Sequence, residues 1–177
     1  GEERRKVIPL NEIPLSMRNA VIAIEDDRFY SHGGVDYVGI LRAAATNLRG
    51  HLSQGASTIT MQVARNFFLS NEKTFSRKIY EVLLAWEIES QLTKDKILEI
   101  YMNQIFLGQR AFGFSSAAQI YFGKELKDIS IAESAMLAGL PKAPSAYNPV
   151  TNFKRAKIRQ EYILQRMRDL GYISTDE

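Results

Sequence analysis

The chain has 177 residues, of which 45% are apolar, and it contains no cysteine. This length predicts one domain, or one domain with a small appended lobe, and the lack of cysteine excludes a disulfide framework and thiolate metal sites. The net charge of +3 is mildly basic, so nucleic acid, a membrane surface and a phosphorylated substrate are all open as anionic partners. No apolar run approaches the roughly 18 to 20 residues that a membrane-spanning helix needs.

Apolar residues recur at helical spacing along most of the chain, which predicts a mainly helical fold. The predicted segments are an extended lead-in over 6–14, helices over 16–25, 36–48, 57–66, 74–92 and 93–108, short helices over 115–122 and 131–140, and a basic amphipathic helix over 154–170. Ser130 and Glu133 have the spacing of a capping box. The apolar residues expected to be buried are Ile79, Val82, Leu83, Trp86 and Ile88 on the 74–92 helix, and Ile158, Tyr162, Ile163 and Met167 on the last helix.

An acidic cluster ends the first predicted helix. Glu25, Asp26 and Asp27 directly follow an apolar stripe, and Gly33 and Gly34 then break the chain. A helix C-terminus carries partial negative charge, so three acids placed there cost free energy. Glu25 lies closest to the apolar stripe, where desolvation is expected to raise its pKa. A carboxylate with a raised pKa is suited to accept a proton near neutral pH. Asp27 is expected to face solvent. A solvated acidic helix end is the alternative.

A cationic cluster follows later in the chain. Helical spacing places Arg77 and Glu81 on one face with Lys78 beside them, and Arg65 and Lys73 add two nearby cations. Four cations around one carboxylate suit a pyrophosphate. The alternative is a surface salt bridge worth a few tenths of a kcal/mol, roughly.

Small and hydroxyl residues lie between these two clusters. Gly55, Ser57, Thr58 and Thr60 stand where a loop enters the predicted third helix. Their hydroxyl groups either cap that helix or present hydroxyl and N–H groups to an oxyanion. The segment is not a P-loop, because the Gly-Lys-Ser/Thr ending is missing.

The remaining candidates carry less chemistry. His32 and His51 have no partners at metal-ligand spacing, so a structural role is favoured. The basic C-terminal helix admits a nucleic-acid interface, although a solvated outer face is favoured. The apolar run 67–69 lies beside cations, which suits an interfacial membrane contact, with core packing as the alternative.

In order, these segments resemble the motifs of the bacterial peptidoglycan glycosyltransferases, the family of chain-polymerising domains in class A penicillin-binding proteins and monofunctional transglycosylases. The matching motifs are Glu25-Asp26-x-x-Phe29-Tyr30-x-His32-x-Gly34, Gly55-x-Ser57-Thr58-Ile59-Thr60-x-Gln62, Arg77-Lys78-x-x-Glu81, Lys96-Ile97-Leu98-Glu99-x-Tyr101-x-Asn103 and Ala117-Ala118-x-x-Tyr121-Phe122-x-Lys124. The resemblance covers nearly the whole chain.

The resemblance implies a single domain over 1–177 with a lysozyme-like helical lobe and a smaller apolar jaw, roughly 43–80, that dips into the bilayer. It implies polymerisation of lipid II into glycan strands, with inversion at C1 and release of undecaprenyl pyrophosphate. The implied partners are lipid II, the growing strand and the membrane at the periplasmic face of the bacterial inner membrane, and not nucleic acid. A transmembrane helix and a transpeptidase domain are expected in the full-length protein.

By motif match, Glu25 is the general base that deprotonates the 4-hydroxyl of the acceptor sugar. The cations Arg65, Lys73, Arg77 and Lys78 stabilise the leaving pyrophosphate. Glu81 positions that group or holds a divalent cation, Mg or Mn, beside it; no obligatory cofactor is implied. The matched substrate-binding positions are Phe29, Ser57, Thr58, Gln62 and Asn103.

Three positions depart from the commonest family pattern: Met61 replaces a frequent glutamine, Arg65 a lysine and Lys73 an arginine, and the cation changes keep charge but alter geometry. A lysozyme-like hydrolase or lytic transglycosylase is the alternative enzyme, and a glycan- or membrane-binding module the alternative class. A pyrophosphate site favours the polymerase, because cleaving a glycosidic bond needs none. The segments 48–54 and 70–74 are expected to be disordered.

Overall fold

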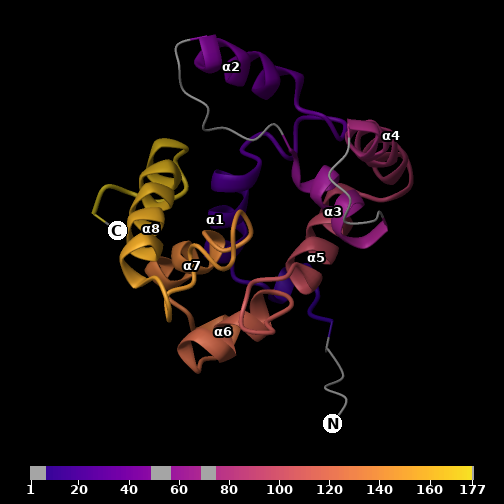
Figure 1. The fold of residues 1–177 in the computed structure, drawn as a ribbon. Coiled ribbons are helices and arrows are strands. Elements are labelled where there is room, and N and C mark those ends of the chain that lie inside the picture. Colours follow the sequence, from indigo (N-terminus) through magenta and orange to yellow (C-terminus); the bar gives the residue numbers. More distant parts are fainter. Residues whose placement is uncertain (1–6, 49–56, 69–74, 177) are drawn as a thin grey trace. The chain divides into compact units, whose positions relative to one another are not determined.

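The computed structural model describes residues 7–48, 57–68 and 75–176. Its elements are η1 (Leu10–Glu12), α1 (Leu15–Glu25), α2 (Tyr37–Leu48), α3 (Ile59–Phe68), α4 (Phe75–Gln91), α5 (Lys94–Gln104), α6 (Phe114–Phe122), η2 (Leu126–Asp128), α7 (Ile131–Ala138) and α8 (Phe153–Asp169) (Figure 1). The mainly helical class is confirmed. Nearly all of the two segments expected to be disordered, and Lys73 and His51, lie outside the described residues.

Side-chain caps begin several helices where the sequence predicts them. The Asp36 carboxylate accepts a hydrogen bond from the Gly39 N–H at 3.0 Å, and the Thr93 hydroxyl accepts one from Lys96 N–H at 3.1 Å. Ser130 and Glu133 form the complete capping box at the start of α7. These caps satisfy backbone N–H groups that have no partner within their own helices.

One predicted boundary is wrong, and two short elements escaped prediction. The helix expected to run to Gly108 ends at Gln104, because the following residues form an antiparallel bridge between Phe106 and Phe112. The 3₁₀ turns η1 and η2 each span three residues. Segments this short carry no detectable helical period.

The chain divides into two compact units. One unit comprises Gly1–Ile24 with Glu99–Glu177, and the other comprises Glu25–Leu98. The predicted jaw of residues 43–80 falls within the second unit, and its bilayer role stays a prediction.

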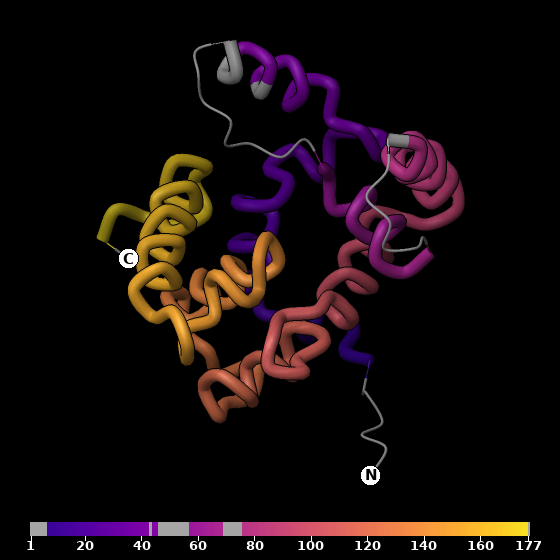
Figure 2. Tube along the Cα trace, in the orientation of Figure 1, coloured from indigo at the N-terminus to yellow at the C-terminus, as the bar shows by residue number. Residues whose placement is uncertain are grey.

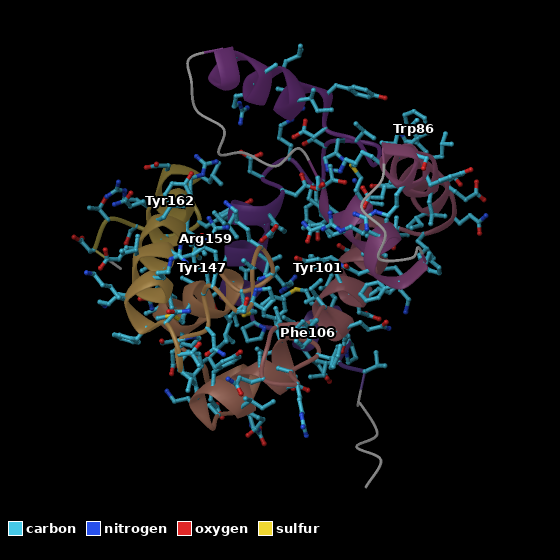
Figure 3. The ribbon with its side chains drawn as sticks, viewed as in Figure 1. Trp86, Tyr101, Phe106, Tyr147, Arg159 and Tyr162 are labelled. Atoms are coloured by element: carbon cyan, nitrogen blue, oxygen red, sulfur yellow. The ribbon has the colours of Figure 1, made fainter. Side chains whose placement is uncertain are left out.

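In the first unit α7 packs against α8. The α8 residues Ala156, Ile163 and Met167 are buried, but Ile158 is 61% exposed and Tyr162 39% exposed, so the prediction that these two residues are buried is wrong. Residues 158 and 163 differ by about 140° around a helix, which places them on different faces. The Arg159 guanidinium lies 5.4 Å from the Tyr147 ring centroid, and both residues are labelled in Figure 3.

The lead-in segment of the first unit is tied to α5. The Asn103 side chain accepts from the Ile8 N–H at 2.8 Å and donates to the Ile8 carbonyl at 2.9 Å. Glu99 accepts from the Leu10 N–H at 3.1 Å. Two side chains one helical turn apart therefore hold a segment far away in sequence.

In the second unit α3 and α4 lie side by side (Figure 1). Met61 packs with Val35, Ala85 and Val82 in a buried cluster. The predictions for α4 are partly wrong, since Ile79, Leu83 and Trp86 are 49%, 51% and 43% exposed. The buried α4 residues Glu81, Ala85 and Ile88 form one helical stripe, which leaves the apolar stripe of Ile79, Leu83 and Trp86 outside.

The chain doubles back tightly between α5 and α6 (Figure 2), and Gly113 permits this reversal. Gly113 has a φ of 85°, and a Cβ atom there would lie 2.2 Å from the Asn103 carbonyl oxygen. A side chain at this position therefore meets both an unfavourable backbone conformation and a main-chain clash.

Replacing Gly113 with alanine should lower the free energy of unfolding by about 3 kcal/mol, because backbone strain and overlap act together. Gly123→Ala is the matched control, since Gly123 has a φ of 63° with no atom near the added Cβ. The control should lose about 1 kcal/mol from backbone strain alone. Urea unfolding measures both, and equal losses would contradict this explanation.

Candidate functional site

The N-terminus of α3 is fixed by two buried side chains. The Thr58 hydroxyl accepts from the Met61 N–H at 3.1 Å and donates to the Gly34 carbonyl at 2.7 Å. The Asp26 carboxylate accepts from the Ile59 N–H at 3.1 Å. An acidic group also interacts favourably with the positive end of the helix dipole. The capping interpretation of the hydroxyl-rich segment is therefore confirmed for Thr58.

A histidine holds the capping aspartate in place. His32 Nε2 lies 2.6 Å from Asp26 Oδ2, with side-chain exposures of 4% and 2%. The Gly34 N–H donates to His32 Nδ1 at 3.0 Å. Because a main-chain N–H can only donate, Nδ1 accepts this bond, and the ring hydrogen on Nε2 points to Asp26. His32 thus has the structural role favoured from its sequence context.

The predicted base lies against α3. Gln62 Nε2 donates to Glu25 Oε2 at 3.1 Å, and Gln62 is 6% exposed. Glu25 is also the chain neighbour of Asp26, which caps the same helix. The Glu25 carboxylate is therefore positioned both through the main chain and through the Gln62 side chain.

The predicted cation cluster forms around a buried carboxylate. Glu81 is 1% exposed, and the cationic nitrogens of Lys78, Arg65 and Arg77 lie 3.1, 3.7 and 3.9 Å from its oxygens. Lys78 also donates to the Ser57 hydroxyl at 2.8 Å. Three cations against one carboxylate leave net positive charge, and the side chains of Arg65 and Lys78 are 33% and 45% exposed. Such a group attracts an anion with several oxygens.

One helix connects the base and the cation cluster. Gln62 and Arg65 both lie on α3, one turn apart, where Gln62 contacts Glu25 and Arg65 contacts Glu81. Positions three residues apart face the same way and are separated by about 4.5 Å along the helix axis. A proton acceptor and an anion-binding cluster are therefore supported by the same helix face.

Three predicted substrate-binding residues make contacts that also serve the fold. Phe29 is fully buried, with Lys94 Nζ 4.6 Å from its ring centroid, and Thr58 is 2% exposed in its cap. Asn103 belongs to the first unit, where its amide bonds to Ile8 and to the Glu99 carbonyl. Contact of these three residues with substrate stays a prediction.

A polar network behind the site was not predicted. Lys94 Nζ lies 2.6 Å from Glu89 and 3.3 Å from His32 Nδ1, and the Thr60 hydroxyl donates to Glu89 at 2.8 Å. Thr60, Glu89 and Lys94 come from three different helices and His32 from the loop between α1 and α2, so no periodicity within one helix connects them. Asp27, expected to face solvent, is 19% exposed and lies 3.5 Å from Arg42.

Comparisons with known proteins identify relatives of this chain. A family model described as Transglycosylase matches residues 1–168. A Cupriavidus necator protein provisionally named as a transglycosylase is 63% identical over 170 residues, which cover 96% of this chain and 74% of that protein. Penicillin-binding protein 1A of Neisseria gonorrhoeae is 60% identical over 178 residues, covering 100% of this chain and 22% of that protein.

A crystal structure of penicillin-binding protein 1A from Haemophilus influenzae matches with a TM-score of 0.59 and 30% identity, over 99% of this chain and 17% of that one. The fold and the site define a helical protein in which Gln62 holds one carboxylate, Glu25, and three cations surround a second, Glu81. The chain belongs to the transglycosylase family, and its peptidoglycan glycosyltransferase class, expected from the motifs, is confirmed. It spans about a fifth of the penicillin-binding proteins 1A that it matches.

Replacing Glu81 with glutamine should lower the free energy of unfolding by about 3 kcal/mol, because three neighbouring cations lose their buried counter-charge. Adding inorganic pyrophosphate should restore part of this loss, since the anion replaces the missing charge. Urea unfolding with and without pyrophosphate measures both effects.

Glu133→Gln is the matched control, because Glu133 pairs with Lys124 at 3.0 Å in a partly exposed setting. This variant should lose about 1 kcal/mol or less and should not respond to pyrophosphate. An equal loss in both variants, with no pyrophosphate effect, would show that the cluster around Glu81 is an ordinary salt bridge.

Proposed function

We propose that this domain polymerises lipid II into glycan strands at the periplasmic face of the bacterial inner membrane. The observation that carries the proposal is the shared support of Glu25 and the Glu81 cation cluster by Gln62 and Arg65 of α3. A transfer reaction that expels a pyrophosphate needs a proton acceptor for the attacking hydroxyl and a cationic site for the leaving group.

Glu25 acts as the general base. Its carboxylate takes the proton of the acceptor's 4-hydroxyl as that oxygen bonds to C1 of the donor sugar. The bond between C1 and the pyrophosphate oxygen breaks with inversion, and undecaprenyl pyrophosphate leaves with the electron pair. The hydrogen bond from Gln62 restricts the rotamer of Glu25, so the base is oriented before substrate arrives.

The cations around Glu81 stabilise the leaving group. Charge grows on the pyrophosphate oxygens as the bond to C1 breaks, and Arg65, Arg77 and Lys78 bind those oxygens. Glu81 and Ser57 hold Lys78 through contacts of 3.1 and 2.8 Å. Preorganised cations need little rearrangement during the reaction, which lowers the barrier. Lys73 is proposed to join this group.

A resident metal ion does not suit this cluster. Glu81 already lies within 4 Å of three cations, and no group of three metal-ligating side chains occurs in the part of the chain that the structure describes. A second positive ion at Glu81 would be repelled by these neighbours. We therefore propose that a divalent cation, where it contributes, arrives bound to the pyrophosphate of the substrate.

The second unit is proposed to contact the bilayer through exposed apolar residues. On α2 the side chains of Tyr37, Val38, Ile40 and Leu41 are 62%, 45%, 38% and 71% exposed, and on α3 Phe68 is 64% exposed. Apolar side chains of this kind favour insertion at a membrane surface. In the described residues, no helix is long and apolar enough to cross a bilayer. This contact would bring the site to its lipid-linked substrate.

Glu25→Gln should abolish glycan-strand synthesis from lipid II while leaving the thermal unfolding temperature unchanged, because the amide fills the same space but accepts no proton. Asp27→Asn is the control, because Asp27 is a carboxylate two positions after Glu25 that has no proposed catalytic role. This variant should retain synthesis. Gel analysis of labelled products measures activity, and an EDTA arm tests for a divalent cation. Polymerisation by Glu25→Gln at a near wild-type rate would contradict the role of Glu25 as base.

Leu41→Asp should weaken binding to vesicles of anionic phospholipid by tenfold or more, since burying one leucine contributes about 1.5 to 3 kcal/mol. Val150→Asp is the control, because Val150 is 68% exposed but belongs to the first unit. Cosedimentation with vesicles measures both variants. An equal loss in the two variants would indicate a non-specific charge effect and contradict an α2 contact.

A further inference from the structure

The connection between α5 and α6 is a short, well-braced hairpin. Phe106 and Phe112 form an antiparallel bridge, flanked by hydrogen bonds from Leu107 N–H to the Ala111 carbonyl at 2.8 Å and from Gly113 N–H to the Ile105 carbonyl at 2.7 Å. Figure 3 labels Phe106 in this connection. The bridged residues are therefore a non-hydrogen-bonded pair, whose side chains lie close together on one face.

The two faces of the hairpin have different environments. Leu107 and Ala111 are fully buried, and the Tyr121 hydroxyl donates to the Leu107 carbonyl at 2.7 Å. On the opposite face the Phe106 and Phe112 ring centroids lie 5.1 Å apart, and Phe106 is 46% exposed. Burial of one face holds the hairpin rigidly, so the aromatic face is presented in a fixed geometry.

The tip of the hairpin has a strained backbone. Gly108, Gln109 and Arg110 all have positive φ, at 81°, 47° and 60°, and Gln109 and Arg110 are the non-glycine residues with positive φ in the described part of the chain. The left-handed conformation disfavours residues with a Cβ, because the Cβ lies too close to the following carbonyl oxygen. Both side chains are exposed, so core packing does not compensate for this strain.

Glycine would adopt the same backbone without that strain. The tip nevertheless carries an exposed amide and an exposed guanidinium, at Gln109 and Arg110, within four residues of the exposed Phe106 ring. When residues keep a strained backbone and their side chains do not stabilise the fold, a binding or catalytic role for those side chains is indicated. An aromatic surface with hydrogen-bond donors at its edge suits a ligand that has one apolar face and polar groups around its rim.

We propose that this hairpin binds the glycan strand, with Phe106 stacked on the C–H face of an N-acetylated sugar. Gln109 and Arg110 then donate hydrogen bonds to its N-acetyl and hydroxyl oxygens. This inference rests on the proposed function, because it takes the strand made by the enzyme as its ligand. A bilayer is a poorer occupant, since the strained residues at the tip are polar and one of them is charged.

Binding of isolated, uncross-linked glycan strands to the chain, measured by calorimetry, tests the inference. Phe106→Ala should weaken binding by about three- to tenfold, the loss of one aromatic stacking contact. Phe153→Ala is the matched control, because Phe153 is 59% exposed on α8, and it should bind as wild type. Unchanged binding by Phe106→Ala would overturn the inference.

Arg110→Gly separates function from fold. This variant should bind strands more weakly, yet its Tm should rise by about 2 °C as backbone strain is relieved. A fall in Tm would show that the Arg110 side chain serves the fold, and would overturn the argument from strain. A loss of vesicle binding by Phe106→Ala, with strand binding intact, would make the hairpin a membrane contact instead.

The two proposals fail separately. A wild-type chain that binds strands through Phe106 but does not polymerise lipid II would contradict the proposed function alone. A chain that polymerises lipid II but binds strands equally well with and without Phe106 would contradict the hairpin inference alone.

Discussion

The hydrogen bond from the first N–H of α3 to the buried Asp26 carboxylate is the contact on which the site depends. It joins the residue after the predicted base to the helix that carries Gln62 and Arg65. His32 Nε2 lies 2.6 Å from the same carboxylate oxygen, Oδ2. A buried carboxylate is stable only when it is paired. The contacts of Asp26 are therefore costly to break, and they fix the path of the chain around it. Two otherwise separate segments thereby acquire a common geometry.

The helix α3 links this anchored segment to both carboxylates of the candidate site. Its buried face carries Met61 into the core with Val35 and Ala85, which also explains why an apolar residue is accommodated beside Gln62. Its polar residues reach Glu25 and Glu81. A rigid helix supports a precise site better than a loop does. In the proposed mechanism, proton removal from the acceptor and stabilisation of the leaving group therefore depend on one packed unit, which favours a transferase over an enzyme that only hydrolyses.

Local features were predictable from sequence, whereas features that need long-range pairing were not. The spacing of Arg77, Lys78 and Glu81 was enough to place their charges on one face, and the helix start at residue 36, where Asp36 forms the cap, was predicted. Periodicity could not decide which side of α4 is buried, because apolar residues occur on more than one face. The Thr60, Glu89 and Lys94 network joins separate helices. The left-handed backbone at positions 109 and 110 was not predictable either, because neither residue is glycine.

The most direct test of the central claim is a parallel assay on two labelled substrates, lipid II and preformed glycan strands, with products resolved on a gel. The account predicts a ladder of lengthening strands from lipid II, release of undecaprenyl pyrophosphate in step with bond formation, and no shortening of preformed strands. Shortening of preformed strands without a ladder from lipid II would contradict it. That result would assign Glu25 to a hydrolase and leave the cation cluster around Glu81 without a pyrophosphate to bind.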